Sequence, residues 1–450
     1  MKPNANKCKQ PPVNSNLFVV ERDGADTYFL YSPLNRKLGL INAAGVDTLN
    51  KFFGQQALSE KENNYISELY QNKFLNDEEL TPPVFPKNYG FFPHEVTLFI
   101  TSRCNLRCRY CYAEAGKKSV DMDFRMAQAA VDLVAHNAGY AGLPKFAVGF
   151  HGGGEPTTAW PLLTDIVEYA KKTAEKKGLD VELFAATNGM LNKVQREYIL
   201  RNFTGLNISF DGPADIQDFY RPTVGGAGSF ATVRDNLKFF SEAGFPYGIR
   251  ATVTDQSVCR LVEMVEWMKQ EFNPDFLHVE PVWQCGRCLT TGEHSPSDND
   301  FIRYFTLARQ RAEEMGLQLV YSGLRIDSLL SKFCAAPGDG FNVLPEGIVT
   351  SCYEITEGSD PKAELFHYGY YSPETQSFVF DKEKIERLKH YSVEYLDFCR
   401  NCFCKWHCAG DCISKVFGAD STFAHKGSSR CRLNRNLTRI QLEKMINYKP

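Results

Sequence analysis

The chain has 450 residues, 43% hydrophobic and 23% charged, which predicts a soluble globular protein of about two to four domains. The 51 basic and 54 acidic residues leave a net charge of −3, which gives no electrostatic sign of nucleic-acid binding. The polar, proline-containing start and the lack of any run of about 18 apolar residues predict no signal peptide, no membrane span and a cytoplasmic protein.

Residues 1–80 are predicted to form one small domain. The β-rich runs LFVVER (17–22), TYFLYS (27–32) and KLGLIN (37–42) predict three strands. The stretches at 45–54 and 59–74 carry apolar residues at helical spacing, and Ser59 followed by Glu62 predicts a capping box for the second. The segment TPPVFPKNYGFFP (81–93) is rich in proline and aromatic residues and is predicted to be a linker.

From residue 94 to about residue 300, predicted strands alternate with helical stretches such as 124–138 and 161–177. The predicted strands are 95–100, 146–150, 181–186, 206–210, 247–253 and 276–280. Repeats of this kind predict an α/β fold, a parallel sheet curved into a partial (β/α)6 TIM-like barrel. In such a barrel the chemistry lies at the C-terminal ends of the strands.

The loop after the first strand, ITSRCNLRCRYCYAEAG, carries Cys104, Cys108 and Cys111 in the spacing C-x3-C-x2-C. In a chain without an export signal, clustered cysteines indicate metal or redox sites rather than disulfides. Three thiolates on one loop can hold three irons of a [4Fe–4S] cluster and leave the fourth iron open. A zinc site is the alternative, but it needs a fourth Cys or His at short spacing, and none follows before His136.

This loop, with Tyr110 inside it, resembles the radical S-adenosylmethionine superfamily over residues 94–300. The turn after the second strand resembles the superfamily's GGEP motif, which implies contacts to the methionine amine from Gly152, Gly153, Gly154 and Glu155. The resemblance implies that the cluster of Cys104, Cys108 and Cys111 cleaves S-adenosylmethionine reductively to a 5′-deoxyadenosyl radical. It also implies a flavodoxin- or ferredoxin-type reductant.

Two further segments resemble the peptide-modifying branch of the superfamily. They are Thr187-Asn188-Gly189 after the third strand and Ser209-Phe210-Asp211-Gly212-Pro213 at the end of the fourth. The resemblance implies that Tyr110, Asn188, Ser209, Asp211 and Arg250 bind the cosubstrate, with Ser209 and Arg250, on the fifth strand, contacting its carboxylate. Taken singly, each of these polar residues is more simply explained as an ordinary turn or cap, but their order along the barrel strands favours the cosubstrate site.

The C-terminal part is predicted to contain a bridging region (301–333), a cysteine-rich domain (334–432) and a final helix (433–450). The cysteine-rich domain carries a second cysteine group. Cys334 and Cys352 are followed by four cysteines in the spacing C-x2-C-x5-C-x3-C and then by a last one, which are Cys399, Cys402, Cys408, Cys412 and Cys431. This seven-cysteine spacing resembles the SPASM domain, which implies two auxiliary clusters and three [4Fe–4S] clusters in all. A zinc ribbon is the alternative. The resemblance assigns to the outer cluster Cys399, Cys402, Cys408 and Cys431, and to the inner one Cys334, Cys352 and Cys412.

The inner cluster lacks a fourth assigned ligand. Ser328 stands where sulfatase-maturating relatives carry a further cysteine. Either one iron stays open or Cys285 or Cys288 closes the cluster. Cys404 has no role in the SPASM pattern and is interpreted as a structural or spare thiol, while Cys8 and Cys259 are interpreted as ordinary thiols.

Residues 38–79 resemble the PqqD-like, winged-helix-like element that recognises precursor peptides. An exposed strand edge beside a helical groove can bind a leader peptide by β-augmentation, although a domain that merely covers the barrel is the alternative. The combined resemblance implies an oxidoreductase of the sactisynthase type, which forms a thioether from a cysteine sulfur to an α-carbon of a ribosomally made precursor peptide. The alternatives are formylglycine formation in a sulfatase, a carbon–carbon cross-link, or a non-catalytic electron carrier or peptide-binding protein.

Overall fold

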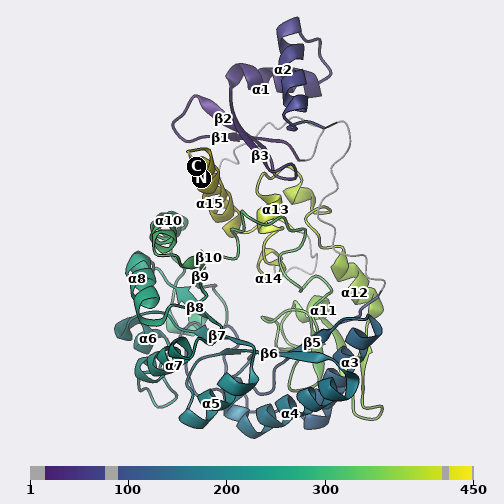
Figure 1. Ribbon diagram of the computed structural model, residues 1–450, viewed down its shortest axis with the longest axis vertical. Coiled ribbons are helices and arrows are strands. Elements are labelled where there is room, and N and C mark those ends of the chain that lie inside the picture. The colour runs from purple at the N-terminus through teal and green to yellow at the C-terminus, as the bar shows by residue number, and fades with distance from the viewer. Residues whose placement is uncertain (1–15, 77–89, 418–424, 448–450) are drawn as a thin grey trace.

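The computed structural model describes residues 16–76, 90–417 and 425–447 (Figure 1). Cys8 and most of the predicted linker lie outside the described residues. Within these ranges, no helix is both long enough and apolar enough to cross a membrane.

The N-terminal domain follows the predicted order of strands and helices. Its elements are β1 (Phe18–Glu21), β2 (Thr27–Ser32), β3 (Lys37–Asn42), α1 (Ala43–Phe53) and α2 (Glu60–Gln71). The strands form an antiparallel sheet in the order β1-β2-β3, so β3 is an edge strand. The predicted capping box is confirmed, because the Ser59 side chain accepts from the backbone of Glu62 and the Glu62 carboxylate accepts from the backbone of Ser59.

The predicted parallel sheet is confirmed, and its strands pair in chain order. They are β4 (Glu95–Leu98), β5 (Lys145–Phe150), β6 (Asp180–Thr187), β7 (Gly205–Ser209), β8 (Tyr247–Val253) and β9 (Phe276–Pro281). The helices between them are α3 (Phe124–Tyr140), α4 (Trp160–Lys177), α5 (Lys193–Asn202), α6 (Ala214–Tyr220), α7 (Phe230–Glu242) and α8 (Leu261–Phe272). Figure 1 shows these helices on the outer side of a curved, open sheet.

The sheet is longer than the six predicted strands. β10 (Gln318–Val320) pairs parallel with β9, and β11 (Asn342–Val343) pairs parallel with β4. Beyond β11 the sheet continues antiparallel through β12 (Ile348–Thr350), β13 (His367–Ser372) and β14 (Ser377–Phe380). The segment predicted only as a bridge therefore contains β10 and most of α10 (Asp298–Glu314), and the cysteine-rich part continues the barrel sheet.

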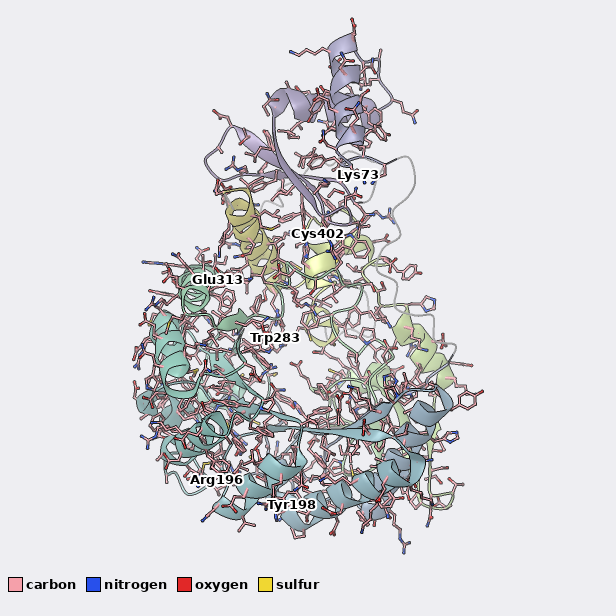
Figure 2. All side chains as sticks on the ribbon, viewed as in Figure 1. Lys73, Arg196, Tyr198, Trp283, Glu313 and Cys402 are labelled. Atoms are coloured by element: carbon pink, nitrogen blue, oxygen red, sulfur yellow. The ribbon has the colours of Figure 1, made fainter. Side chains whose placement is uncertain are left out.

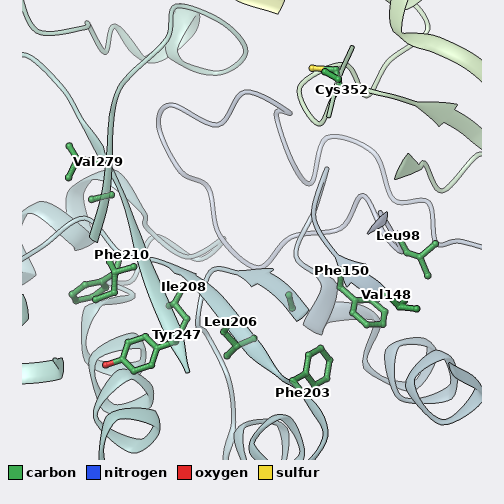
Figure 3. Close-up of a cluster of buried hydrophobic side chains, with 14 of the residues drawn as sticks. Leu98, Val148, Phe150, Phe203, Leu206, Ile208, Phe210, Tyr247, Val279 and Cys352 are labelled. Atoms are coloured by element: carbon green, nitrogen blue, oxygen red, sulfur yellow. The ribbon is translucent and has the colours of Figure 1, made fainter. Parts of the chain in front are cut away.

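One large core joins the barrel to the C-terminal part. Figure 3 shows some of its side chains, including Phe150 of β5, Ile208 of β7 and Phe210 directly after β7, and Cys352 on a C-terminal segment. The short C-terminal helices are α11 (Ala363–Phe366), α12 (Lys382–Lys389), α13 (Lys405–Cys408) and α14 (Ile413–Val416). The last helix, α15 (Arg430–Asn447), runs toward the N-terminal sheet (Figure 1).

The N-terminal sheet packs on the cysteine-rich part through its own apolar cluster. This second cluster contains Phe18, Val20, Phe29, Tyr31, Phe403, Cys404, Cys408 and Leu442. Because every one of these side chains is buried, the N-terminal domain is docked on the segment around α13 and on α15.

Candidate functional site

The loop that follows β4 gathers Cys104, Cys108 and Cys111. Burial, the Glu155 carboxylate and the other two thiols raise the pKa of Cys104 to about 12. Burial also raises the pKa of Cys108 to about 11, against the opposing charge of Arg221. The backbone N–H groups of Leu106 and Ala115 donate to the sulfurs of Cys104 and Cys111, each at 3.4 Å. The loop thus holds three neighbouring thiols, and burial is the main cause that raises the pKa of Cys104 and of Cys108.

The chemistry of these three side chains suits an iron–sulfur cluster. Cys104, Cys108 and Cys111 are free thiols on one loop. A [4Fe–4S] cluster is held by cysteine thiolates, each on a different iron. The donor set therefore fits a cluster.

A second loop, which precedes α9 (Cys288–Thr291), binds the cysteine loop through Arg287. The guanidinium of Arg287 donates to the carbonyl oxygens of Cys108 and Ala115, both at 2.8 Å. The backbone N–H of Arg287 donates to the carbonyl of Cys111 at 3.0 Å. No sequence motif pointed to Arg287, because its role is visible only once the two loops are in contact.

Two positions of the turn after β5, Gly152 and Gly154, have room only for glycine. A Cβ on Gly154 would lie 2.1 Å from the Arg103 carbonyl oxygen, and one on Gly152 would lie 1.7 Å from the Gly154 carbonyl oxygen. Neither approach is possible for a side chain, so the backbone of this turn lies directly against the cysteine loop. Gly153 has open space around its Cβ position, with only Thr356 at 4.0 Å.

Glu155 is 3% exposed, and protein groups occupy both oxygens of its carboxylate. Thr157 and the Thr187 hydroxyl donate to one oxygen, the latter at 2.7 Å, and the backbone N–H of Asn188 donates to the other at 2.7 Å. Glu155 therefore ties the ends of β5 and β6 together. These contacts provide hydrogen-bond donors from the protein for both oxygens of the Glu155 carboxylate.

Asp211 is fully buried beneath the cysteine loop. Its carboxylate accepts from the Tyr110 hydroxyl, from the Arg221 guanidinium at 2.9 and 3.1 Å, and from the backbone of Thr252 at 3.0 Å. Arg221 also lies over the Tyr110 ring at 5.3 Å. The Asp211 carboxylate thus joins the Tyr110 hydroxyl to Arg221 and supports the loop. The contact of Asp211 and Tyr110 with the cosubstrate stays a prediction.

The remaining predicted cosubstrate residues are Asn188, Ser209 and Arg250, which lie on or directly after three neighbouring strands. Ser209 is the last residue of β7 and is paired in register with Arg250, an exposed residue in the middle of β8. Asn188 follows β6, and its side-chain nitrogen donates to Asn105 at 2.7 Å and lies 3.9 Å from the Cys104 sulfur. Burial, with the Arg250 charge as a second cause, lowers the pKa of His151, next to the glycine turn, to about 4. The contact of Asn188, Ser209 and Arg250 with the cosubstrate stays a prediction.

The C-terminal cysteines form two separate neighbourhoods. Burial, then the Glu354 carboxylate, Cys412 and Cys334 raise the pKa of Cys352 far above its ordinary value. In the other neighbourhood, burial and then Cys408, Cys402 and Cys431 raise the pKa of Cys399. The structure thus brings together the same two sets that the spacing assigns to the inner and outer clusters, and their ligand role remains a prediction.

The thiols of Cys285 and Cys288 have different neighbours. The Cys288 thiol donates to the carbonyls of Trp283 at 3.2 Å and of Cys285 at 2.9 Å, so it is bound to its own loop. Burial and the Glu354 carboxylate raise the pKa of Cys285 to about 12, and the same carboxylate acts on Cys352 and Cys412. The side-chain nitrogen of Lys415 lies 5.5 Å from the ring centre of Trp283, which is in the middle of the molecule in Figure 2. The Cys285 thiol thus shares a neighbouring carboxylate with Cys352 and Cys412 of the inner set, whereas the Cys288 thiol donates within its own loop.

Comparison with known proteins agrees with this geometry. Residues 98–268 match the Radical SAM superfamily. The chain is 30% identical over 172 residues to an uncharacterised protein of Methanocaldococcus jannaschii, and 24% identical over 177 residues to the cysteine-type anaerobic sulfatase-maturating enzyme of Clostridium novyi. It is 32% identical over 171 residues to the mycofactocin maturase MftC of Mycobacterium ulcerans. These alignments cover 38, 38 and 37% of the chain but only 57, 47 and 42% of the relatives.

Two solved structures share the fold. The structure of anSMEcpe with bound AdoMet and Kp18Cys peptide has a TM-score of 0.64 at 17% identity, covering 78% of this chain and 98% of that one. The structure of SuiB from Streptococcus suis with S-adenosylmethionine has a TM-score of 0.53 at 14% identity, covering 92% and 98%. The α/β fold with a central parallel sheet is thus typical of the radical SAM partial barrel.

Proposed function

We propose that this chain is a radical S-adenosylmethionine oxidoreductase that modifies a peptide. The observation that carries the proposal is the grouping of Cys104, Cys108 and Cys111 at the C-terminal end of β4, next to the glycine turn and the exposed Arg250. Homologues with the names sulfatase-maturating enzyme and mycofactocin maturase support a peptide substrate, as does the peptide in the anSMEcpe structure.

The residues around the cysteine loop have distinct roles in this proposal. Cys104, Cys108 and Cys111 would hold a [4Fe–4S] cluster, which when bound would supply the electron for reductive cleavage of S-adenosylmethionine to methionine and a 5′-deoxyadenosyl radical. Arg250 and Ser209 lie side by side and would bind the methionine carboxylate, since a guanidinium and a hydroxyl are suitable donors for it. The glycine turn would let backbone groups approach the methionine amine closely.

The finer proposal is a thioether from a substrate cysteine sulfur to an α-carbon. The inner set of Cys334, Cys352 and Cys412 leaves one iron of a cluster without a ligand from that set. Either Cys285 or a substrate thiolate would complete it, and a metal-bound thiol is deprotonated. The outer set would hold a third cluster, and a flavodoxin- or ferredoxin-type reductant would supply the electrons.

The products of the reaction test this proposal. With S-adenosylmethionine and a strong reductant, the anaerobically reconstituted protein is expected to release 5′-deoxyadenosine. With its precursor peptide, mass spectrometry is expected to show a loss of two hydrogens and a cysteine that no longer reacts with iodoacetamide. A peptide that loses two hydrogens but keeps an alkylatable cysteine indicates a carbon–carbon cross-link, and loss of sulfur indicates formylglycine. Absence of 5′-deoxyadenosine would leave an electron carrier or peptide-binding protein.

We further propose that the N-terminal domain, a PqqD-like and winged-helix-like element, binds the leader of the precursor. In the described part of the chain no strand pairs with the free edge of β3, and Leu40 on this strand is 45% exposed. An extended peptide can add to such an edge as a fourth strand.

Replacing Leu40 by Asp is expected to weaken precursor binding at least several-fold, because a charge replaces an apolar contact at the edge strand. Fluorescence anisotropy with a labelled precursor measures this affinity. Val194→Asp, at a 68% exposed valine on α5, is the matched control and should leave affinity unchanged. 5′-Deoxyadenosine release without peptide should be the same in both variants. Equal precursor affinity in Leu40→Asp and the control would rule out this edge as the leader site.

A further inference from the structure

Cys404 is the one cysteine of the outer neighbourhood to which the seven-cysteine spacing gives no role. Its sulfur lies 3.3 Å from the sulfur of Cys402, and its side chain is 1% exposed. Its carbonyl accepts from the backbone of His407 at 2.9 Å and of Cys408 at 3.0 Å. The thiol is therefore held inside a tight turn, next to a predicted cluster ligand.

Either thiol of this pair could donate in the contact between their sulfurs. A cysteine that ligates iron does so as a thiolate and has no proton to donate. With Cys402 as a ligand of the proposed outer cluster, Cys404 is therefore the donor and the Cys402 sulfur the acceptor.

The N-terminal domain excludes water from the Cys404 thiol and fixes its position. Phe18, Phe29 and Tyr31 pack with Cys404 in one buried apolar cluster, and Figure 2 shows Cys402 close to the N-terminal domain. His407 donates through Nδ1 to the Ser328 carbonyl at 3.0 Å, so its Nε2 accepts from the Tyr31 hydroxyl at 2.5 Å. Because water is excluded, a hydrogen bond at this position is stronger than in solvent.

A donor to a ligating sulfur has a known effect on an iron–sulfur cluster. Reduction adds negative charge that is shared by the sulfurs, and a hydrogen bond to a sulfur stabilises that charge. The donor therefore raises the reduction potential, and its removal lowers it.

We propose that Cys404 is a positioning residue of the outer cluster, which donates its S–H to the ligating sulfur of Cys402 and raises the reduction potential of that cluster. The N-terminal domain is then part of the outer cluster's environment as well as a peptide-binding domain. The inference rests on the proposed outer cluster of Cys399, Cys402, Cys408 and Cys431, but not on the identity of the substrate.

The test compares Cys404→Ala and Cys404→Ser with the full-length parent after anaerobic reconstitution, using iron analysis and a redox titration followed by electron paramagnetic resonance. All three proteins are expected to hold the same iron. The outer-cluster signal should titrate at a lower potential in Cys404→Ala, and Cys404→Ser should recover part of the difference, because its hydroxyl also donates. Cys259→Ala, at an exposed thiol, is the control and should titrate like the parent.

Two results would overturn the inference. A loss of about four irons in Cys404→Ala would make Cys404 a ligand rather than a donor. Identical potentials in the parent, Ala and Ser proteins would show that the contact has no effect on the cluster. A parent protein without an outer-cluster signal is a different failure, because it would remove the proposed cluster assignment together with this inference.

Discussion

Replacing Cys104, Cys108 and Cys111 together by Ala is expected to abolish cleavage of S-adenosylmethionine and to remove about four of about twelve irons from the reconstituted protein. The three thiols are the only cysteines of the loop at the end of β4, where Gly154 and Asn188 also lie against it. Without them no group remains to hold a cluster beside Arg250 and Ser209. Iron analysis and chromatography of 5′-deoxyadenosine measure the two effects.

A matched control removes the same amount of iron elsewhere. Replacing Cys399, Cys402 and Cys431 by Ala should also remove about four irons, but it should leave cleavage of S-adenosylmethionine in place, because these residues lie in the outer neighbourhood. If the first triple variant still cleaves S-adenosylmethionine, the proposed active site is wrong. If both triple variants lose cleavage equally, the loss reports the stability of the protein rather than the loss of one cluster.

The parallel sheet was predictable because its strands have local signals. β8 begins and ends at the predicted residues, 247 and 253, since an apolar run is bounded there by turn and helix signals. β10 and β11 have three and two residues, which is too short for any periodic pattern. Their pairing with β9 and β4 depends on contacts between distant segments, which local sequence does not encode.

The candidate site was predictable to the extent that it depends on spacing. The cysteine loop and the glycine turn have fixed spacings, so the sequence located both. Arg221 and Arg287 could not be found in this way, because an arginine that supports a loop differs from any other arginine only by the partners that the fold brings to it. For the same reason, the contact between Tyr31 and His407, 376 residues apart, had no local signal.

Asp211→Ala is expected to destabilise the barrel by about 3–5 kcal/mol, the usual result of removing one partner of a buried ion pair. Asp211 is 0% exposed and Arg221 is 7% exposed, so the variant leaves the guanidinium buried without a counter-charge. It also removes the acceptor of the Tyr110 hydroxyl and of the Thr252 backbone, and thereby loosens the cysteine loop. Because a chain of this size need not unfold in two states, the midpoint of urea unfolding of the barrel is the measurement to compare.

Asp215→Ala is the control for this prediction, because Asp215 is 67% exposed and pairs with Arg260 at the surface. Exposed pairs contribute about 0–1 kcal/mol, so the midpoint should hardly move. The double variant Asp211→Leu with Arg221→Met should recover much of the stability, since replacing both partners by apolar side chains leaves no buried charge. It should not recover the iron of the cysteine loop, because Tyr110 would still lack its acceptor. An Asp211→Ala midpoint equal to that of the control would contradict the role of this ion pair as the support beneath the loop.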